Sequence, residues 1–207
     1  MSDRLIDRTL RAFSEDLGSE RPVPGGGSAA AYAGALGAAL CAMVLRISAK
    51  KAERPLTERI TEFDNLRTDF LRLVDDDSAA FTRVSDAMKL PRGTADEKAQ
   101  RKERMQSGFL AAARVPLEAG KTARRLLEAC DRITATAGPM TVSDIGVGAL
   151  MAHTALRGAA LNVMINLASL DDAAQVKALS EELDRVVDGA DEIAERVQDH
   201  VTSRIAR

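Results

Sequence analysis

The sequence predicts an all-α fold, and three observations support this prediction. Apolar side chains recur at spacings of three or four residues almost everywhere, and no stretch alternates at period two for the length of a strand. The breaks between the periodic segments hold glycine or proline. With 207 residues, 45% of them hydrophobic, the chain is long and apolar enough for one core. We therefore expect residues 1–207 to form a single compact multi-helix bundle with long antiparallel helices.

Each expected helix has a start or stop signal. Gly18 ends the first helix, Ser28 can cap the second, and the Arg54–Pro55 pair separates the second from the third. Thr94 and Glu97 form a capping box, and Ser143 is a candidate N-cap for the fifth helix. Pro116 is expected to kink or divide the fourth helix. The predicted helices are residues 3–17, 28–48, 56–90, 94–133, 143–167 and 172–205.

Composition and charge exclude several classes of protein. A formal net charge of −2 gives no basic surface for a nucleic-acid backbone, and 3% aromatic residues leave few stacking platforms for single strands. Two cysteines cannot form a secreted disulfide framework, so a reducing cytosol is expected. The charged N-terminus lacks the apolar core of a signal peptide. The uncharged run Ala29–Leu45 is short and weakly hydrophobic, which favours a buried helix over a membrane span.

Small residues mark two helices for close packing. The second helix contains Gly34 and Gly37 among many alanines, and the fifth contains Gly146, Gly148 and Gly158. A glycine inside a helix costs about 1 kcal/mol relative to alanine, so these positions call for a packing reason. We expect the second helix to be central, and the two helices to pack against each other or across a dimer axis. A homodimer is the expected assembly.

Asp77 interrupts an apolar stripe on the third helix. The stripe reads Leu66, Phe70, Leu73, Asp77, Phe81, Val84 and Met88. If it faces the core, burial raises the pKa of the Asp77 carboxyl and prepares the group for proton transfer. The alternative is a structural aspartate paired with an arginine. The neighbours Asp75 and Asp76 point elsewhere and are expected to be solvated.

The segment Pro22–Ser28 contains three consecutive glycines directly before the small-residue helix. Gly25, Gly26 and Gly27 expose backbone N–H groups where the helix dipole is positive, which suits a carboxylate, a phosphate or an oxyanion. No lysine follows as in a phosphate-binding Walker loop, and no strand precedes as in a dinucleotide fold. A plain flexible turn is the alternative.

The fifth helix carries polar residues at both ends of one stripe. Asp144 and Asn162 lie on the same face but are separated by roughly 27 Å of helical rise, so one small molecule cannot touch both. Either the ligand is long or the two ends serve different sites. Alternatively, Asp144 complements the helix dipole, while Asn162 and Asn166 make interhelical hydrogen bonds.

Other kinds of catalytic site are not indicated. His153 and His200 have no partner at a metal-ligand spacing, so no metal site is predicted. Cys41 lies in apolar surroundings that favour an inert thiol.

Several motifs, taken together, resemble the cyclodeaminase/cyclohydrolase family, the C-terminal domain type of formiminotransferase-cyclodeaminase. The resemblance begins with Pro24-Gly25-Gly26-Gly27-Ser28-Ala29-Ala30-Ala31 and spans nearly the whole chain. Further matches are Gly34-Ala35-Leu36, Lys50-Lys51, Asp77 with Ala80-Phe81, Leu90-Pro91-Arg92, Thr94 with Glu97-Lys98 and Arg101, Val115-Pro116-Leu117, Ser143-Asp144, and Ala160-Leu161-Asn162-Val163 with Asn166.

The resemblance implies an all-helical cytoplasmic dimer that acts on one-carbon tetrahydrofolates without a bound cofactor. It implies either cyclodeamination of 5-formimino-tetrahydrofolate or hydrolysis of 5,10-methenyl-tetrahydrofolate, both through a tetrahedral carbon between N5 and N10. Carboxylates of tuned pKa can move the protons, a role that suits Asp77 and Asp144. The expected substrate-binding residues are Gly25, Gly26, Gly27, Ser28, Lys50, Lys51, Arg92, Arg101, Ser143, Asn162 and Asn166, with the four cations facing the anionic glutamate tail.

One departure from the family pattern falls before the Ser143-Asp144 pair. Family members carry a Gly-Asn pair and a further Asn there, whereas this chain has Ala137-Gly138 and Met140. If those asparagines bind substrate in the family, we expect this chain to show either altered substrate choice or loss of activity. The alternative function is a non-catalytic helical dimer of the same family that binds a ligand or a partner.

Overall fold

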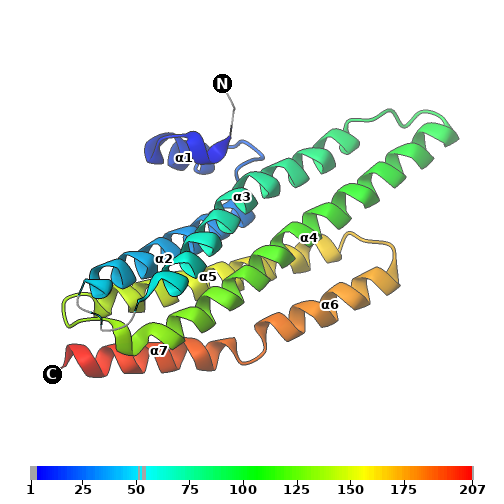
Figure 1. The fold of residues 1–207 in the computed structure, drawn as a ribbon. Helices are drawn as coiled ribbons and strands as arrows, with labels where there is room; N and C mark the ends of the chain where they lie inside the picture. Colours follow the sequence, from blue (N-terminus) through cyan, green and yellow to red (C-terminus); the bar gives the residue numbers. More distant parts are fainter. Residues whose placement is uncertain (1–3, 51, 53–54, 207) are drawn as a thin grey trace.

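A computed structural model describes residues 4–50, 52 and 55–206, and every regular element in these ranges is a helix (Figure 1). This confirms the predicted fold class. The elements are the 3-10 helices η1 (Leu5–Asp7) and η2 (Thr134–Thr136) and the α-helices α1 (Leu10–Leu17), α2 (Gly26–Ala49), α3 (Thr57–Met88), α4 (Ala95–Ile133), α5 (Val142–Leu167), α6 (Ala173–Val187) and α7 (Ala190–Ile205).

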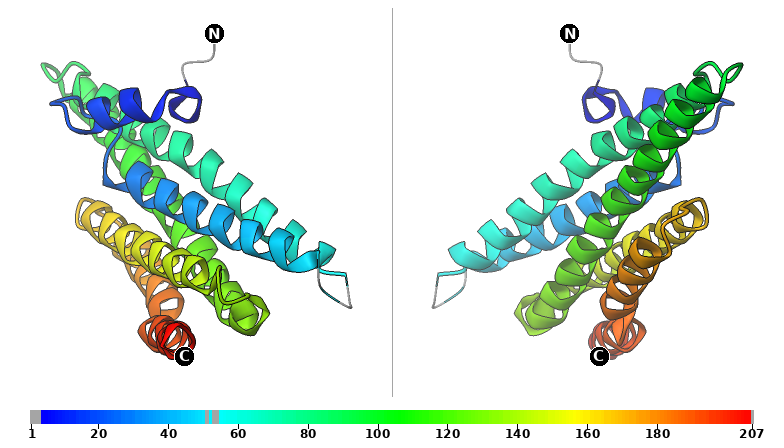
Figure 2. Two further views of the ribbon diagram at one scale, coloured as in Figure 1. Left: turned by 90° about the vertical axis from the view of Figure 1, so that its left-hand side faces the viewer. Right: turned by 90° about the vertical axis from the view of Figure 1, so that its right-hand side faces the viewer.

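Four long helices form the bundle. Contacts connect α2 to α3, α3 to α4, α4 to α5 and α5 back to α2, so the four helices enclose one core. Helices α6 and α7 pack on α4 and α5, on the side away from α1 (Figure 1). Figure 2 shows α2 and α5 side by side on one flank of the bundle. The small-residue helix α2 contacts α3, α5 and, less extensively, α4, which is the central position that its composition predicts.

The glycines of α2 and α5 allow a close crossing within one chain. A Cβ on Gly37 would lie 2.7 Å from the backbone oxygen of Gly148, and one on Gly148 would lie 2.7 Å from Cys41 Sγ. Gly34 faces α3, where a Cβ would lie 2.5 Å from the ring of Phe70. These separations are shorter than van der Waals contact, so glycine is required at each position.

The α3–α4 hairpin extends past the rest of the bundle (Figure 1). Its turn ends in the predicted capping box, in which Thr94 and Glu97 exchange hydrogen bonds with each other's backbone. Because fewer helices surround this end, the apolar stripe of α3 is buried only in part. Leu66, Phe70 and Leu73 lie in the core, whereas Phe81 is 42% exposed.

Several predicted boundaries were wrong. Gly189, at a φ of +65°, divides the expected last helix into α6 and α7, and the expected first helix is η1 followed by α1. Pro116 lies inside α4 and does not divide it, while the alternative of a kink stays a prediction. Ser28 and Ser143 are not N-caps, because α2 and α5 begin earlier, after Gly25 and Thr141. The predicted residues Asp3, Lys51 and Arg54 lie outside the described residues.

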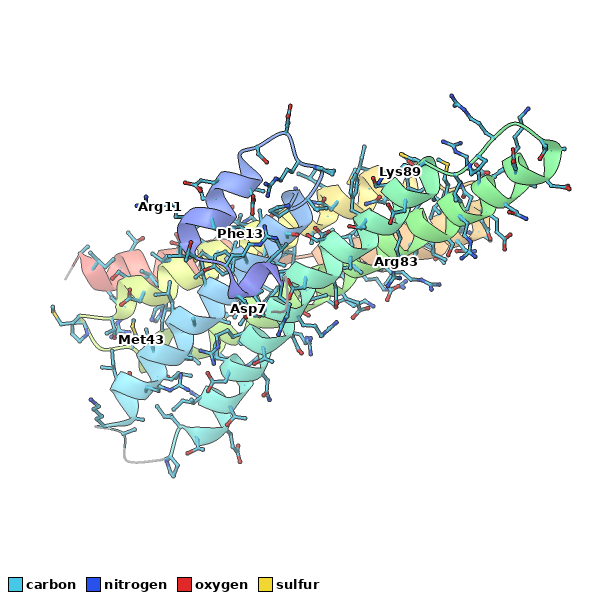
Figure 3. The ribbon with its side chains drawn as sticks, turned by 90° about the horizontal axis from the view of Figure 1, so that it is seen from above. Asp7, Arg11, Phe13, Met43, Arg83 and Lys89 are labelled. Atoms are coloured by element: carbon cyan, nitrogen blue, oxygen red, sulfur yellow. The ribbon has the colours of Figure 1, made fainter. Side chains whose placement is uncertain are left out.

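The N-terminal segment lies over the bundle above α2 (Figure 3). Phe13 packs on Tyr32 of α2, with ring centroids 5.5 Å apart. Asp75 accepts hydrogen bonds from Arg4 Nε at 3.0 Å and from the Leu5 backbone at 2.8 Å, so it anchors η1 to α3 and is not the solvated residue we predicted. In the same view Lys89 lies toward the hairpin tip and Met43 toward the opposite end.

By length and hydropathy alone, α2 is a candidate for a membrane span, and 61% of its most apolar window is buried inside the protein. Its position between α3 and α5 is that of a core helix.

Candidate functional site

Asp77 projects from α3 against the first turn of α2. A Cβ on Gly27 would lie 2.6 Å from Asp77 Cγ and 2.8 Å from Oδ2, so only glycine lets the carboxyl approach. The Ser28 hydroxyl donates to Asp77 Oδ2 at 2.9 Å. The hydrogen-bond partner of Asp77 within the described residues is thus a serine, not the arginine of the structural alternative.

The glycine turn, Asp77 and two amides meet around one cavity of about 150 Å³. The first helical bond of α2 runs from Ala29 N–H to the Gly25 oxygen, so the N–H groups of residues 26–28 precede the intrahelical ladder. These N–H groups carry the positive end of the α2 dipole toward the cavity. The lining residues are Pro22, Val23, Gly25, Gly26, Gly27, Asp77, Phe81, Ala112, Asn162 and Asn166.

The pKa of Asp77 is raised above its ordinary value. Burial is the main cause, because it disfavours the charged form, while hydrogen bonds from the side chain and backbone of Ser28 oppose the shift. Such a carboxyl can both hold and release a proton in the range where an ordinary aspartate stays ionised.

Both amides are oriented by α-helical carbonyls. Asn162 Nδ2 donates to the Gly158 oxygen at 2.8 Å, and Asn166 Nδ2 donates to the oxygens of Ala112 and Asn162 at 3.0 and 2.7 Å. Because the partner atoms are carbonyl oxygens, these amide ends must be the NH₂ groups. No described residue donates to either Oδ1, so the amides offer acceptors to a ligand in the cavity. The structural alternative, in which these amides make hydrogen bonds within and between helices, is therefore correct for the NH₂ groups but leaves the Oδ1 atoms unused by the described residues.

Ser28 does not line the cavity, contrary to its expected role in substrate binding. Its side chain is fully buried behind Asp77, and it also contacts the Val74 oxygen and Ser78 Oγ. The pattern of the sequence placed Ser28 correctly next to the glycines but could not show that its hydroxyl turns inward.

A second group of predicted site residues lies at the other end of the α2–α5 pair. Lys50 follows α2, roughly 36 Å of helical rise from Gly26, and it is exposed. Ser143 and Asp144 lie in the first turn of α5 and do not line the Asp77 cavity. The structure therefore keeps the roughly 27 Å separation of Asp144 from Asn162 within one chain.

A third group lies at the hairpin tip. Arg92 and Arg101 line a separate surface pocket of about 350 Å³ together with Lys98 and Lys102. Along α4, Arg101 is 11 residues before Ala112 of the Asp77 cavity, which corresponds to roughly 16 Å. The pocket thus gathers four cationic side chains at the hairpin tip.

Four cavity residues were missed at the sequence level. Phe81 was assigned to the core because it continues the apolar stripe of α3, but the cavity lies at that point of the helix. Pro22 and Val23 belong to the segment that was singled out before α2, but they were not among the expected site residues. Ala112 comes from α4 and carries no signal in its sequence context.

A family model described as formiminotransferase-cyclodeaminase matches residues 9–185. The chain is 35% identical to a methenyltetrahydrofolate cyclohydrolase from Methylorubrum extorquens, over 96% of this chain and 98% of that protein. It is 34% identical to the formimidoyltransferase-cyclodeaminase of Rattus norvegicus, over 81% of this chain but 32% of that longer protein.

The fold also has a solved counterpart. A crystal structure of formiminotetrahydrofolate cyclodeaminase from Thermotoga maritima superposes with a TM-score of 0.83 at 24% identity, covering 95% of this chain and 97% of that one. The fold and the sequence motifs thus point to the same family. The chain belongs to the formiminotransferase-cyclodeaminase family, a family of one-carbon folate cyclohydrolases and cyclodeaminases.

Proposed function

We propose that this protein is a methenyltetrahydrofolate cyclohydrolase in which Asp77 is the acid–base catalyst. The observation that carries the proposal is the contact of the Asp77 carboxyl with Gly27, beside a cavity that also holds two amide acceptors. A half-buried carboxyl of raised pKa can take a proton from water and deliver it to a nitrogen.

Hydrolysis is favoured over deamination by sequence identity among the relatives that match over nearly their full length. The cyclohydrolase from Methylorubrum extorquens is 35% identical to this chain, whereas the cyclodeaminase from Thermotoga maritima is 24% identical. Formimino-tetrahydrofolate cyclodeamination is the second candidate, since there too a carboxyl can take a proton from the attacking group and give one to the nitrogen that leaves.

The proposed reaction balances with one catalytic proton. Ionised Asp77 accepts a proton from water as the water oxygen adds to the carbon between N5 and N10. The tetrahedral adduct collapses to an N10-formyl group as the C–N5 bond breaks, and Asp77 returns its proton to N5. The second proton of the water leaves to solvent. The negative carboxylate also stabilises the cationic methenyl group in the cavity.

A cavity of about 150 Å³ has room for one ring system but not for a complete folate. The Oδ1 atoms of Asn162 and Asn166 would accept from the amino and ring N–H groups of a pterin. The N–H groups of the glycine turn would face developing negative charge on an attacking oxygen. The glutamate tail then lies outside, where we assign it to Arg92 and Arg101 on the basis of their position at the hairpin tip. Lys50 lies at the opposite end of α2 and does not line the pocket at the hairpin tip.

We further propose that the protein acts as a homodimer through an apolar face formed by α2 and α5. Five exposed apolar residues lie on α5, among them Leu161 and Ile165 at 67% and 68% exposure, and three more lie on α2. These residues are Leu36, Met43, Ile47, Val147, Leu150, Leu161, Met164 and Ile165. Exposed apolar surface of this extent is typical of an association site.

A two-fold dimer with antiparallel α5 helices would explain how Asp144 can act at a cavity although it lies far from the cavity of its own chain. Such a dimer brings the first turn of one α5 to the last turn of the other, next to Asn166. Asp144 of the partner subunit, with Ser143 and Lys50 of the partner subunit, would then complete the cavity.

We propose the reducing cytosol as the compartment of the protein. The buried free thiols of Cys41 and Cys130 suit that environment.

The test is a spectroscopic assay on the purified protein. Hydrolysis of 5,10-methenyl-tetrahydrofolate, followed as loss of its absorbance, should exceed the buffer rate and be abolished in a folded Asp77→Ala variant. Turnover of the formimino compound alone would replace the proposal with the deaminase. No turnover of either compound would leave the non-catalytic binding module as the function.

A further inference from the structure

The hydroxyl of Ser28 has three oxygen partners in a fully buried position. Its Oγ lies 2.9 Å from Asp77 Oδ2, 3.1 Å from the Val74 carbonyl oxygen and 3.1 Å from Ser78 Oγ. A hydroxyl has one proton to donate and two lone pairs that accept. Since Val74 O only accepts, Ser28 can donate either to Val74 or to Asp77, but not fully to both.

The two choices match the two protonation states of Asp77. When Asp77 is ionised, Ser28 donates to Oδ2 and accepts from Ser78. When Oδ2 carries a proton, that proton can be donated to Ser28 Oγ, and Ser28 turns its own proton to the Val74 oxygen. In both states each donor in this group has an acceptor, so Asp77 can gain and lose a proton without leaving a buried polar atom unpaired.

We propose that Ser28, supported by Ser78, is a positioning residue that serves both protonation states of Asp77 by rotating its hydroxyl between Asp77 and Val74. The inference deepens the proposed function, because a general acid–base must alternate between these states. It also gives Ser28 a role different from the substrate contact that the motif suggested.

The surroundings of Asp77 make the hydroxyl the main adjustable partner. The α2 residues beside it are glycines, α4 contributes Ala112, and α5 contributes the uncharged Asn162 and Asn166. On α3 itself, Asp75 pairs with Arg4 and Asp76 with Arg72.

The decisive measurement is the titration of the Asp77 carboxyl by NMR on protein labelled with ¹³C-aspartate, assigned by comparison with Asp77→Asn. In Ser28→Ala both forms of Asp77 lose a partner, but the ionised form loses the stronger, charge-assisted hydrogen bond, so the midpoint moves to higher pH. The value of kcat/KM should then fall about tenfold more at the acid end of the profile than at its alkaline end. Ser28→Thr keeps a hydroxyl and should restore the profile. The control Ser203→Ala removes an exposed hydroxyl on α7 and should change neither readout.

Ser78→Ala tests the inference even where Ser28 variants fail to fold, and it should move the titration in the same direction by less. An unchanged titration in Ser28→Ala or, in its absence, in Ser78→Ala overturns the inference, as does a loss of activity that is equal at every pH. The titration needs no substrate. A shift in a protein without cyclohydrolase activity would therefore sink the proposed function alone, and activity with an unshifted titration would sink this inference alone.

Discussion

Gly27 and Asp77 are in contact across the α2–α3 interface so closely that no side chain fits between them. The carboxyl of Asp77 takes the space that a Cβ on residue 27 would fill, with Cγ only 2.6 Å from that position. The third glycine of the turn is therefore the structural complement of the proposed catalytic carboxyl, as well as a source of backbone N–H groups.

Gly27→Ala should inactivate the enzyme by displacing Asp77. The added methyl overlaps the carboxyl, so the side chain must leave its rotamer and its bond to Ser28. We expect kcat to fall by about 10² or more, in the range for a lost general acid–base group, as measured in the absorbance assay. The matched control is Gly120→Ala, another helical glycine, where the new Cβ meets Val186 at 3.5 Å. That variant should stay active and gain up to about 1 kcal/mol.

Asp77→Asn should lose activity and gain stability at neutral pH. A carboxyl whose pKa is raised by folding binds its proton more tightly in the folded state. Its contribution to stability is therefore present at low pH and is lost as pH rises from the unfolded pKa, near 3.8, through the folded pKa. An asparagine at this position does not ionise, so this loss of stability disappears, and its amide oxygen can still accept a hydrogen bond from Ser28. Thermal melts should show Asp77→Asn more stable than wild type at pH 8 and the difference shrinking at pH 4. A wild-type advantage at pH 8 would contradict the burial effect.

Asn162→Ala should weaken substrate binding more than turnover. The variant removes one acceptor from the cavity wall, a loss of about 1 kcal/mol for a hydrogen bond to a neutral ligand. We expect KM for methenyl-tetrahydrofolate to rise several-fold while kcat changes less. Asn65→Ala, an exposed amide on α3, is the control and should leave KM unchanged. A fall in kcat with constant KM would instead place Asn162 in the chemical step.

Charges on the apolar face should dissociate the proposed dimer. Leu161→Glu combined with Ile165→Glu puts two carboxylates where the partner would pack, and sedimentation or light scattering should report a monomer with little activity. Leu10→Glu, at an exposed position of α1, should not change the mass. A wild-type monomer in solution would contradict the dimer itself.

Mixed dimers separate the two possible sources of Asp144. Asp77→Asn and Asp144→Asn chains, each inactive alone, should regain about a quarter of wild-type activity when mixed and reassembled, because each mixed dimer retains one complete site. No recovery would mean that each site uses the Asp144 of its own chain.

The sequence predicted the Asp77 cavity more completely than the two other groups of expected site residues, at the hairpin tip and at the far end of α2. Asp77 stood out because a carboxylate in an apolar stripe is costly, and the glycines because they precede a helix of small residues. Both signals are local, and both residues line one cavity. The cations Arg92 and Lys50 had no such local signal, and the structure places them tens of ångströms apart along the helices.

The sequence by itself determined the helical class, the capping box of α4 and the small-residue faces of α2 and α5, because periodicity, caps and missing side chains act over a few residues. Only the tertiary structure decided that the Ser28 side chain turns inward to Asp77 and that Phe81 and Ala112 line the cavity. It also decided that Asp144 of the same chain lies far from Asp77. These relationships depend on which helices are in contact and at which positions along their length. Contacts between residues that are distant in the chain determine both.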